Sequence, residues 1–219
     1  MSEPLPTLVC FAVNEEAKFF SAKLAAIPHV RVLVTGMGAH HATVGSQRAF
    51  AANPPRLVLT CGFAGGLNPE LAACAVVFSE DAEAGLGPRL HELGAMPVRF
   101  HCANRVAVTT AEKAELRRAT GADAVEMESQ VIREICRQHG IPSATIRVIS
   151  DPATEDLPLD FNALMTPTMK IHFGKLAWQI AKSPGKIPAL MALQKRTDAA
   201  AKKLGEILVK LLTDAPRSK

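Results

Sequence analysis

The segment MESQVIREICRQHGIPSATIRVIS, residues 127–150, decides the fold class, because a helical pattern in it leads directly into a strand-like one. Apolar residues recur with the period of a helix over Met127–His139, and Gly140 with Pro142 forms a helix stop signal. The following run, Ala144–Ser150, is short and almost continuously apolar. Such a run is typical of a strand that is covered on both faces of a sheet.

The same alternation recurs along the rest of the chain. Further apolar runs of strand length lie at Thr7–Val13, Val30–Thr35, Leu57–Cys61, Ala73–Phe78 and Arg105–Thr109. Helical patterns lie between several of them, at Glu15–Ala26, Ala39–Ala52 and Ala111–Thr120, the last preceded by the capping-box spacing Thr109-x-x-Glu112. Strands that alternate with helices predict an α/β fold with a mostly parallel sheet.

Composition favours one globular domain without a nucleic-acid partner. The chain has 219 residues, 48% of them apolar, which is enough for a full core. The net charge is +4, but much of the basic excess lies in residues 170–219, where it is typical of a solvated helix face. Aromatic residues make up only 5% of the chain and tyrosine is absent, so no RNA-binding aromatic pattern is present.

The cysteine and histidine spacing predicts no metal site. The five cysteines are odd in number and widely spaced, and most lie in apolar runs, which favours reduced core residues of a cytoplasmic protein. His40 and His41 are adjacent, and neighbouring residues point to different faces of a helix, so they form a poor chelate. No stretch of about 18 apolar residues predicts a membrane span, and the first residues, MSEPLP, do not resemble a targeting signal.

The chain changes character after Asp151. A polar loop, a short segment at Phe161–Met165 and a helix around Trp178 lead to a break at residues 183–185. A long amphipathic helix then opens at Pro188 and carries Leu190, Leu193, Leu204, Ile207, Leu208 and Leu211 on one side. We expect a helical C-terminal extension over about residues 170–213 whose last helix packs across the sheet.

Candidate site residues follow directly after the apolar runs, because ligands of parallel α/β sheets bind outside the carboxyl ends of the strands. These positions are Asn14–Glu16, Gly36–Gly38, Gly62–Gly66 and Asp151, together with the helix start at Glu126–Glu128. The stretch GMGAHH is only the first part of a dinucleotide fingerprint, and GFAGG has no central serine or cysteine for a nucleophile elbow.

The two glutamates of AVEMES separate on a helical projection. Glu128 falls on the stripe of Val131, Ile132 and Ile135, whereas Glu126 falls on the polar side. We therefore expect Glu126 to be a surface charge and Glu128 to face inward. There Glu128 either interacts with the helix dipole and reaches solvent or accepts hydrogen bonds from a ligand such as a pair of sugar hydroxyls.

The acids at the other strand ends also leave two interpretations. Asp151 is either a cap for the turn at Pro152 or a proton donor whose pKa burial raises. Glu16 is expected to point at the sheet end while Glu15 faces outward, although acids in a first helical turn are often only dipole partners. Gly62–Gly66 is either a turn or a backbone that lets a ligand approach closely.

Five blocks, FAVNEEA, VTGMGAHHA, TCGFAGGL, AVEMES and IRVISD, in this order and spacing resemble the nucleoside phosphorylase superfamily, and its methylthioadenosine/S-adenosylhomocysteine nucleosidase branch most of all. The resemblance covers about residues 7–151, and the C-terminal part is similar to hopanoid-biosynthesis-associated phosphorylase-like proteins. It implies a single-domain three-layer αβα fold with a mixed, mostly parallel sheet, no metal or organic cofactor, a small nucleoside as ligand, and a homodimer.

The resemblance also implies roles for single residues. Asp151 matches the acid that protonates N7 of the purine, and Glu16 matches the glutamate that positions or activates water. Met127 and Glu128 match the ribose contacts. Substrate binding is further expected at Gly62, Phe63, Ala64 and Ser150.

Hydrolysis of the N-glycosidic bond of a purine nucleoside, of adenine type and 5′-substituted, is the expected reaction. Phosphorolysis of the same bond and a non-catalytic nucleoside-binding role are the alternatives. A phosphate nucleophile needs cationic or N–H-rich binding. At the matching positions of phosphorolytic relatives this chain carries Thr60 and Phe63 in place of Arg and Ser. The first loop carries Glu15 and Glu16, whose carboxylates would repel phosphate. Lys18 could still bind phosphate.

Overall fold

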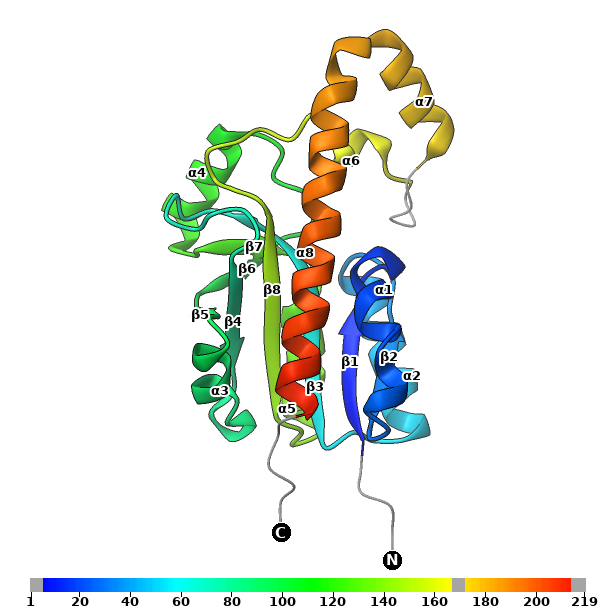
Figure 1. Cartoon of the computed structure of the whole chain (residues 1–219), viewed down its shortest axis with the longest axis vertical. Coiled ribbons are helices and arrows are strands. Elements are labelled where there is room, and N and C mark those ends of the chain that lie inside the picture. Colours follow the sequence, from blue (N-terminus) through cyan, green and yellow to red (C-terminus); the bar gives the residue numbers. More distant parts are fainter. Residues whose placement is uncertain (1–5, 167–171, 214–219) are drawn as a thin grey trace, which may run out of the picture.

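A mixed, mostly parallel sheet forms the centre of the molecule, as the sequence predicted (Figure 1). The structure, a computed structural model, describes residues 6–166 and 172–213. The main strand order is β2-β1-β3-β8-β4-β5, with β7 pairing the end of β3 and β6 pairing β7. The strands are β1 (Thr7–Phe11), β2 (Val30–Val34), β3 (Leu57–Gly66), β4 (Val76–Glu80), β5 (Met96–Pro97), β6 (Phe100–Cys102), β7 (Ala124–Glu126) and β8 (Ser143–Asp151). Strands β2, β1, β3 and β8 are parallel, whereas β4 runs antiparallel to β8.

Strand alternation assigns side chains to the two faces of this sheet, and helices cover both faces. In β1, Val9 and Phe11 join one core cluster, whereas Leu8 and Cys10 join another. Helices α1 (Asn14–Ser21) and α8 (Ile187–Thr213) pack on the first face, and α2 (Ala39–Ala52) and α5 (Ser129–Gln138) pack on the second. The arrangement is therefore the predicted three-layer αβα fold.

The structure corrects several predicted elements. Residues 105–109 form no strand, because two side chains and a loop backbone, rather than a neighbouring strand, bond to their backbone. Asn162 bonds both the N–H and the carbonyl of Val106, Glu112 accepts from the Val108 N–H, and the Leu157 N–H donates to the Val108 carbonyl. The glycine-rich stretch 62–66 is no turn but the second half of β3, paired with β8 up to Gly65 and with β7 at Gly65 and Gly66. The short strands β5, β6 and β7 and helix α3 (Gly87–Glu92) were not predicted, since they lack a long periodic signal.

The predicted capping box is present at the start of α4 (Thr110–Thr120), where Thr109 accepts from the backbone of Glu112 and the Glu112 carboxylate accepts from that of Thr109. Gly140 follows the C-terminus of α5 and has a φ of 64°, a left-handed conformation that favours glycine and stops the helix.

The C-terminal helices extend past the carboxyl ends of the strands (Figure 1). Short α6 (Phe161–Leu164) and α7 (Phe173–Lys182) precede a 3₁₀ turn at Pro184–Lys186, and α8 follows. The second half of α8 packs across the sheet as predicted, and Leu204, Leu208 and Leu211 are buried there. Leu190 and Leu193 are only partly buried. Of the predicted extension, positions 170 and 171 lie outside the described residues. Among the helices that the structure describes, none combines the length and apolarity needed to cross a bilayer.

Candidate active site

A hollow of about 230 Å³ lies where β1, β3, β7 and β8 end, and it brings together most of the predicted site residues. Its lining includes Glu16, Phe63, Ala64, Met127, Glu128, Ser150 and Asp151. Gly62 is not among the lining residues. The hollow is mainly apolar, and its four lining carboxylates come from three separate segments of the sequence. An apolar pocket with a few convergent polar groups is the usual form of a small-molecule site.

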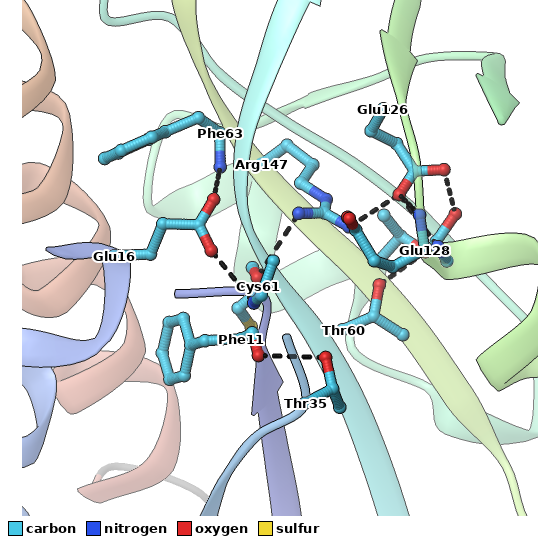
Figure 2. Close-up of polar contacts among 12 residues, drawn as sticks. Phe11, Glu16, Thr35, Thr60, Cys61, Phe63, Glu126, Glu128 and Arg147 are labelled. Atoms are coloured by element: carbon cyan, nitrogen blue, oxygen red, sulfur yellow. Dashed lines mark hydrogen bonds and ion pairs between the residues drawn. The ribbon is translucent and has the colours of Figure 1, made fainter. Parts of the chain in front are cut away.

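Glu16 lies on the wall of this hollow, with only 5% of the residue exposed. One carboxylate oxygen accepts from the backbone N–H of Ala12 at 3.0 Å and of Val13 at 3.3 Å, and the other accepts from Phe63 at 2.8 Å (Figure 2). Burial raises the pKa of Glu16 to about 7, although Arg147 and these N–H groups oppose the rise. Glu15 is exposed, so the predicted division between the two acids is confirmed.

Gly62 leaves the space that Glu16 needs. A Cβ atom at this position would lie 2.4 Å from both Glu16 Oε1 and Arg147 Nη1, and the φ angle of 152° is one that L residues rarely adopt. Gly62 therefore lies behind the pocket wall. Because it has no side chain, the Glu16 carboxylate and the Arg147 guanidinium can both lie beside β3 at this position.

Arg147, which the sequence analysis did not single out, is the centre of a buried charge cluster (Figure 2). It lies in the middle of β8 and is 2% exposed. Its Nη2 atom is 2.5 Å from Glu126 Oε2 and 3.4 Å from Glu128 Oε2, and its Nη1 donates to the Cys61 carbonyl at 3.3 Å. Burial alone would lower the pKa of Arg147, but the surrounding glutamates raise it above its ordinary value. A charged residue inside the apolar run ATIRVIS was the signal that could have predicted buried carboxylate partners.

Glu126 is a buried residue and not the predicted surface charge. It is 4% exposed, because it ends strand β7 and helix α5 begins only at Ser129, so the helical projection did not apply to it. Its Oε2 accepts from the backbone N–H groups of Glu128 at 3.0 Å and Ser129 at 2.8 Å, which caps α5. Burial disfavours its ionised form, yet Arg147 and these N–H groups hold its pKa below the ordinary value.

Glu128 faces inward, as predicted, with 6% of the residue exposed. It is the residue before the first turn of α5, and its Oε1 accepts from the backbone N–H of Gly38 at 2.8 Å. This bond connects α5 to the turn that precedes α2. Burial raises the pKa of Glu128, although Arg147 opposes the rise. Its carboxylate also lines the hollow, beside Met127 and across from residues of β3 and β8.

Asp151 and Ser150 line the hollow together because β8 has an irregular register. Ala64 pairs with Ile149 and Gly65 pairs with Asp151, so Ser150 is an extra residue in β8. Such a bulge changes the direction in which side chains point and is common beside active sites. The Ser150 hydroxyl donates to Asp151 Oδ1 at 2.6 Å. Burial raises the pKa of Asp151, while the nearby Lys113 ammonium lowers it.

Lys113, a second residue that the sequence analysis missed, contacts Asp151 from α4. Its Nζ atom lies 2.7 Å from Asp151 Oδ2, and no part of the lysine is exposed. A lysine in the mostly polar helix TAEKAELRRAT gives no periodic signal of burial, so only the tertiary structure shows this contact.

Cations for a phosphate ion are scarce at the pocket wall. Lys18 does not line the hollow, and its Nζ lies 2.5 Å from Asp198 of α8. Thr60 is buried, and its hydroxyl bonds to that of Thr145 across β3 and β8. Arg105 is the one cationic side chain in the described lining, and it forms an ion pair with Glu112.

A second hollow of about 530 Å³ shares Met37 and Met127 with the first. Its lining also includes residues 38–41 at the start of α2 and residues 102–104 at the end of β6. The two hollows are therefore neighbours, separated by the two methionines.

Comparisons with known proteins agree with this architecture. The family model described as the phosphorylase superfamily matches residues 80–181. The 5′-methylthioadenosine/S-adenosylhomocysteine nucleosidase of Glaesserella parasuis is 24% identical, over 75% of this chain and 84% of the relative.

Solved structures show the same fold. The 5′-methylthioadenosine/S-adenosylhomocysteine nucleosidase of Helicobacter pylori, in complex with butyl-thio-DADMe-Immucillin-A, has a TM-score of 0.72 at 15% identity and covers 97% of this chain and 100% of its own. Native futalosine hydrolase of Helicobacter pylori has a TM-score of 0.69 at 16% identity and covers 96% of this chain and 98% of its own. These matches confirm the resemblance to the phosphorylase superfamily that the sequence blocks predicted. The resemblance of the C-terminal part stays a prediction.

Proposed function

We propose that this chain, which has the fold of the phosphorylase superfamily, hydrolyses the N-glycosidic bond of a purine nucleoside to free base and sugar. The observation that carries the proposal is the placement of two buried acids, Glu16 and Asp151, in one hollow that is otherwise mainly apolar. Cleavage of this bond develops positive charge on the ribosyl ring and moves electrons onto the base. The reaction therefore needs a general acid near the purine and a general base that activates water.

Asp151 is the proposed general acid. Its burial raises its pKa, so the protonated carboxyl persists to higher pH than in a solvated aspartate. As the glycosidic bond breaks, its electron pair moves to the purine, and Asp151 donates its proton to a ring nitrogen. Ser150, bonded to Oδ1, limits the orientations of the carboxyl.

Glu16 is the proposed general base. A carboxylate with a pKa of about 7 holds a proton it has taken from water better than an ordinary glutamate does, and it is still ionised in a large fraction of molecules near neutral pH. Three backbone N–H groups fix its two oxygens, so its direction is set before substrate binds.

Glu128 and Met127 are the proposed ribose contacts, and Phe63 and Ala64 the proposed base contacts. Both oxygens of Glu128 keep a second lone pair beyond their bonds to Gly38 and Arg147, so the carboxylate can accept from two vicinal hydroxyls. The second hollow, reached past Met37 and Met127, offers room for a substituent at the 5′ position. We therefore propose a 5′-substituted, adenine-type nucleoside as substrate.

The charges of the lining favour water over phosphate as the nucleophile. Glu16, Glu126, Glu128 and Asp151 all line the hollow, whereas Arg105, the one cation in the described lining, is paired with Glu112. Arg147 lies outside the lining and is already bonded to Glu126 and Glu128. A phosphate dianion placed near these carboxylates would be repelled. The matched relatives named above, two nucleosidases and a futalosine hydrolase, are consistent with this choice.

The decisive experiment measures release of free adenine from methylthioadenosine, S-adenosylhomocysteine and adenosine, with and without phosphate. We expect phosphate-independent release that is almost lost in Asp151→Asn, with the variant still folded by circular dichroism. Release that requires phosphate and yields ribose 1-phosphate would replace hydrolysis by phosphorolysis. Binding without release from any nucleoside would instead support a non-catalytic nucleoside-binding protein.

A further inference from the structure

The Lys113 side chain is buried behind the proposed acid and touches it directly. Lys113 lies in the second turn of α4 and is fully buried, and its Nζ is 2.7 Å from Asp151 Oδ2. It is not among the residues that line the hollow. Asp151 therefore has two sides: it lines the pocket, and its Oδ2 is held by a lysine from outside the pocket.

Three acceptors surround the lysine nitrogen. Besides Asp151 Oδ2, Nζ donates to the carbonyl of Pro152 at 2.9 Å and to that of Glu155 at 2.8 Å. An ammonium has three N–H donors and matches three acceptors, whereas a neutral amine would direct its lone pair at one of the oxygens. The three acceptors thus match the three N–H donors of an ammonium beside an ionised Asp151.

The loop that supplies these carbonyls is itself fixed on α4 and α8. The Leu157 N–H donates to the Val108 carbonyl at 2.8 Å, and the Thr110 N–H donates to Asp156 at 2.6 Å. The Glu155 side chain forms an ion pair with Arg196 of α8. The lysine position is therefore determined by packed elements on two sides and does not depend on a bound ligand.

We propose that Lys113 is a positioning residue that holds the Asp151 carboxyl for proton donation and stabilises the carboxylate that donation leaves behind. This inference rests on the proposed function. In the reaction, Asp151 gives its proton to the purine as the glycosidic electron pair moves to the base, and Lys113 keeps its own three protons. An anion forms next to a fixed cation in a water-poor site, where such stabilisation is strong.

Two cations, on α4 and α8, act on the Asp151 carboxyl. Lys113 of α4 is in contact, and Arg196 of α8 acts on Asp151 from a greater distance while paired with Glu155. Both cations lower the pKa of Asp151, against the burial that raises it. Because the Arg196 side chain is 28% exposed and already paired, we expect its effect to be the smaller one.

The test compares Lys113→Met, Lys113→Gln and Lys113→Arg with the native chain, and Arg196→Gln serves as the matched control. Aspartate carboxyl carbons are labelled, and the Asp151 resonance is identified by its absence in Asp151→Asn. Its titration midpoint is read by NMR for each folded variant, so this readout does not require turnover. The pH profile of kcat is then measured with the nucleoside that the native chain cleaves best.

Loss of the ammonium should raise the Asp151 midpoint by at least about one pH unit in Lys113→Met and Lys113→Gln. The alkaline limb of kcat should move up with it, and kcat should fall about tenfold or more with little change in KM, because a weaker acid donates less readily. Lys113→Arg should retain the native midpoint, and Arg196→Gln should shift it less than either uncharged variant.

An unchanged midpoint in a folded Lys113→Gln chain would overturn the proposal, and so would a native pH profile that accompanies only a lower melting temperature. If Lys113→Met does not fold, Lys113→Gln decides, since it keeps two N–H donors without the charge. If the native chain cleaves no nucleoside, the proposed function fails, but the NMR midpoints still show whether Lys113 controls Asp151.

Discussion

Replacing Glu16 with glutamine should remove a pH dependence of stability that this one residue causes. Glu16 is 5% exposed, and burial raises its pKa from an ordinary value of 4.5 to about 7. Between these two values the folded chain binds a proton at Glu16 that the unfolded chain has already released. Stability from this group is therefore fully present below about pH 4.5 and is lost as pH rises through about 7.

The size of the effect follows from the same pair of values. Each pKa unit corresponds to about 1.4 kcal/mol, so the free energy of unfolding should fall by about 3 kcal/mol across this window because of Glu16. Asp151 and Glu128, whose pKa values burial also raises, contribute in the same direction in both proteins. The difference between the native chain and Glu16→Gln isolates the contribution of Glu16.

The assay is urea unfolding at a series of pH values, followed by far-ultraviolet circular dichroism. This signal is preferable to fluorescence, because the single tryptophan, Trp178, lies 59% exposed on α7 and reports poorly on the core. Glu15→Gln is the matched control, since its side chain is exposed and one position away. Parallel slopes for the native chain and Glu16→Gln would refute the reasoning, because Glu16 would then have the same pKa in the folded and unfolded chains. Catalytically, kcat/KM of the native chain should rise with pH through about 7, and Glu16→Gln should lose at least about a hundredfold.

Three further substitutions test the charge cluster and the pocket wall. Arg147→Met should lower the free energy of unfolding by about 3–5 kcal/mol, measured with urea, because it leaves buried glutamates without their cation; a loss no greater than that of the exposed control Arg137→Met would contradict this. Gly62→Ala should cost at least about 2 kcal/mol through both a strained φ and a clash with Glu16 and Arg147. Gly94→Ala, with φ of 80° and open space, has the strain alone and should cost less. Glu128→Gln should raise KM for ribosides more than for 2′-deoxyribosides, and equal effects on both would remove Glu128 as a hydroxyl acceptor.

Local sequence signals predicted the elements that local interactions build. The bounds of α2 agree with the predicted Ala39–Ala52, and the capping box at Thr109 marks the start of α4. Both depend on contacts within a few residues. The predicted strand at Arg105–Thr109 was wrong because its backbone partners, such as Asn162, are far away in sequence and do not alter the apolar pattern.

The assignment of the two glutamates in AVEMES shows the limit of periodicity. Glu128 was placed correctly, but Glu126 was placed wrongly, because α5 begins at Ser129 and a three-residue strand precedes it. A helical projection is valid only where the backbone is helical. The bulge at Ser150, which lets Ser150 and Asp151 line one pocket, also leaves no trace in the apolar run.

By itself, the sequence determined the α/β architecture and the edge of the sheet at which the site lies, because strand and helix periods and the polar residues after each strand are local properties. Only the tertiary structure decided which charges meet there. Arg147 joins Glu126 and Glu128, and Lys113 joins Asp151, across 21, 19 and 38 positions of the chain. Pairing over such separations is set by how β7, β8, α4 and α5 pack, and buried ions require the partners that this packing brings to them.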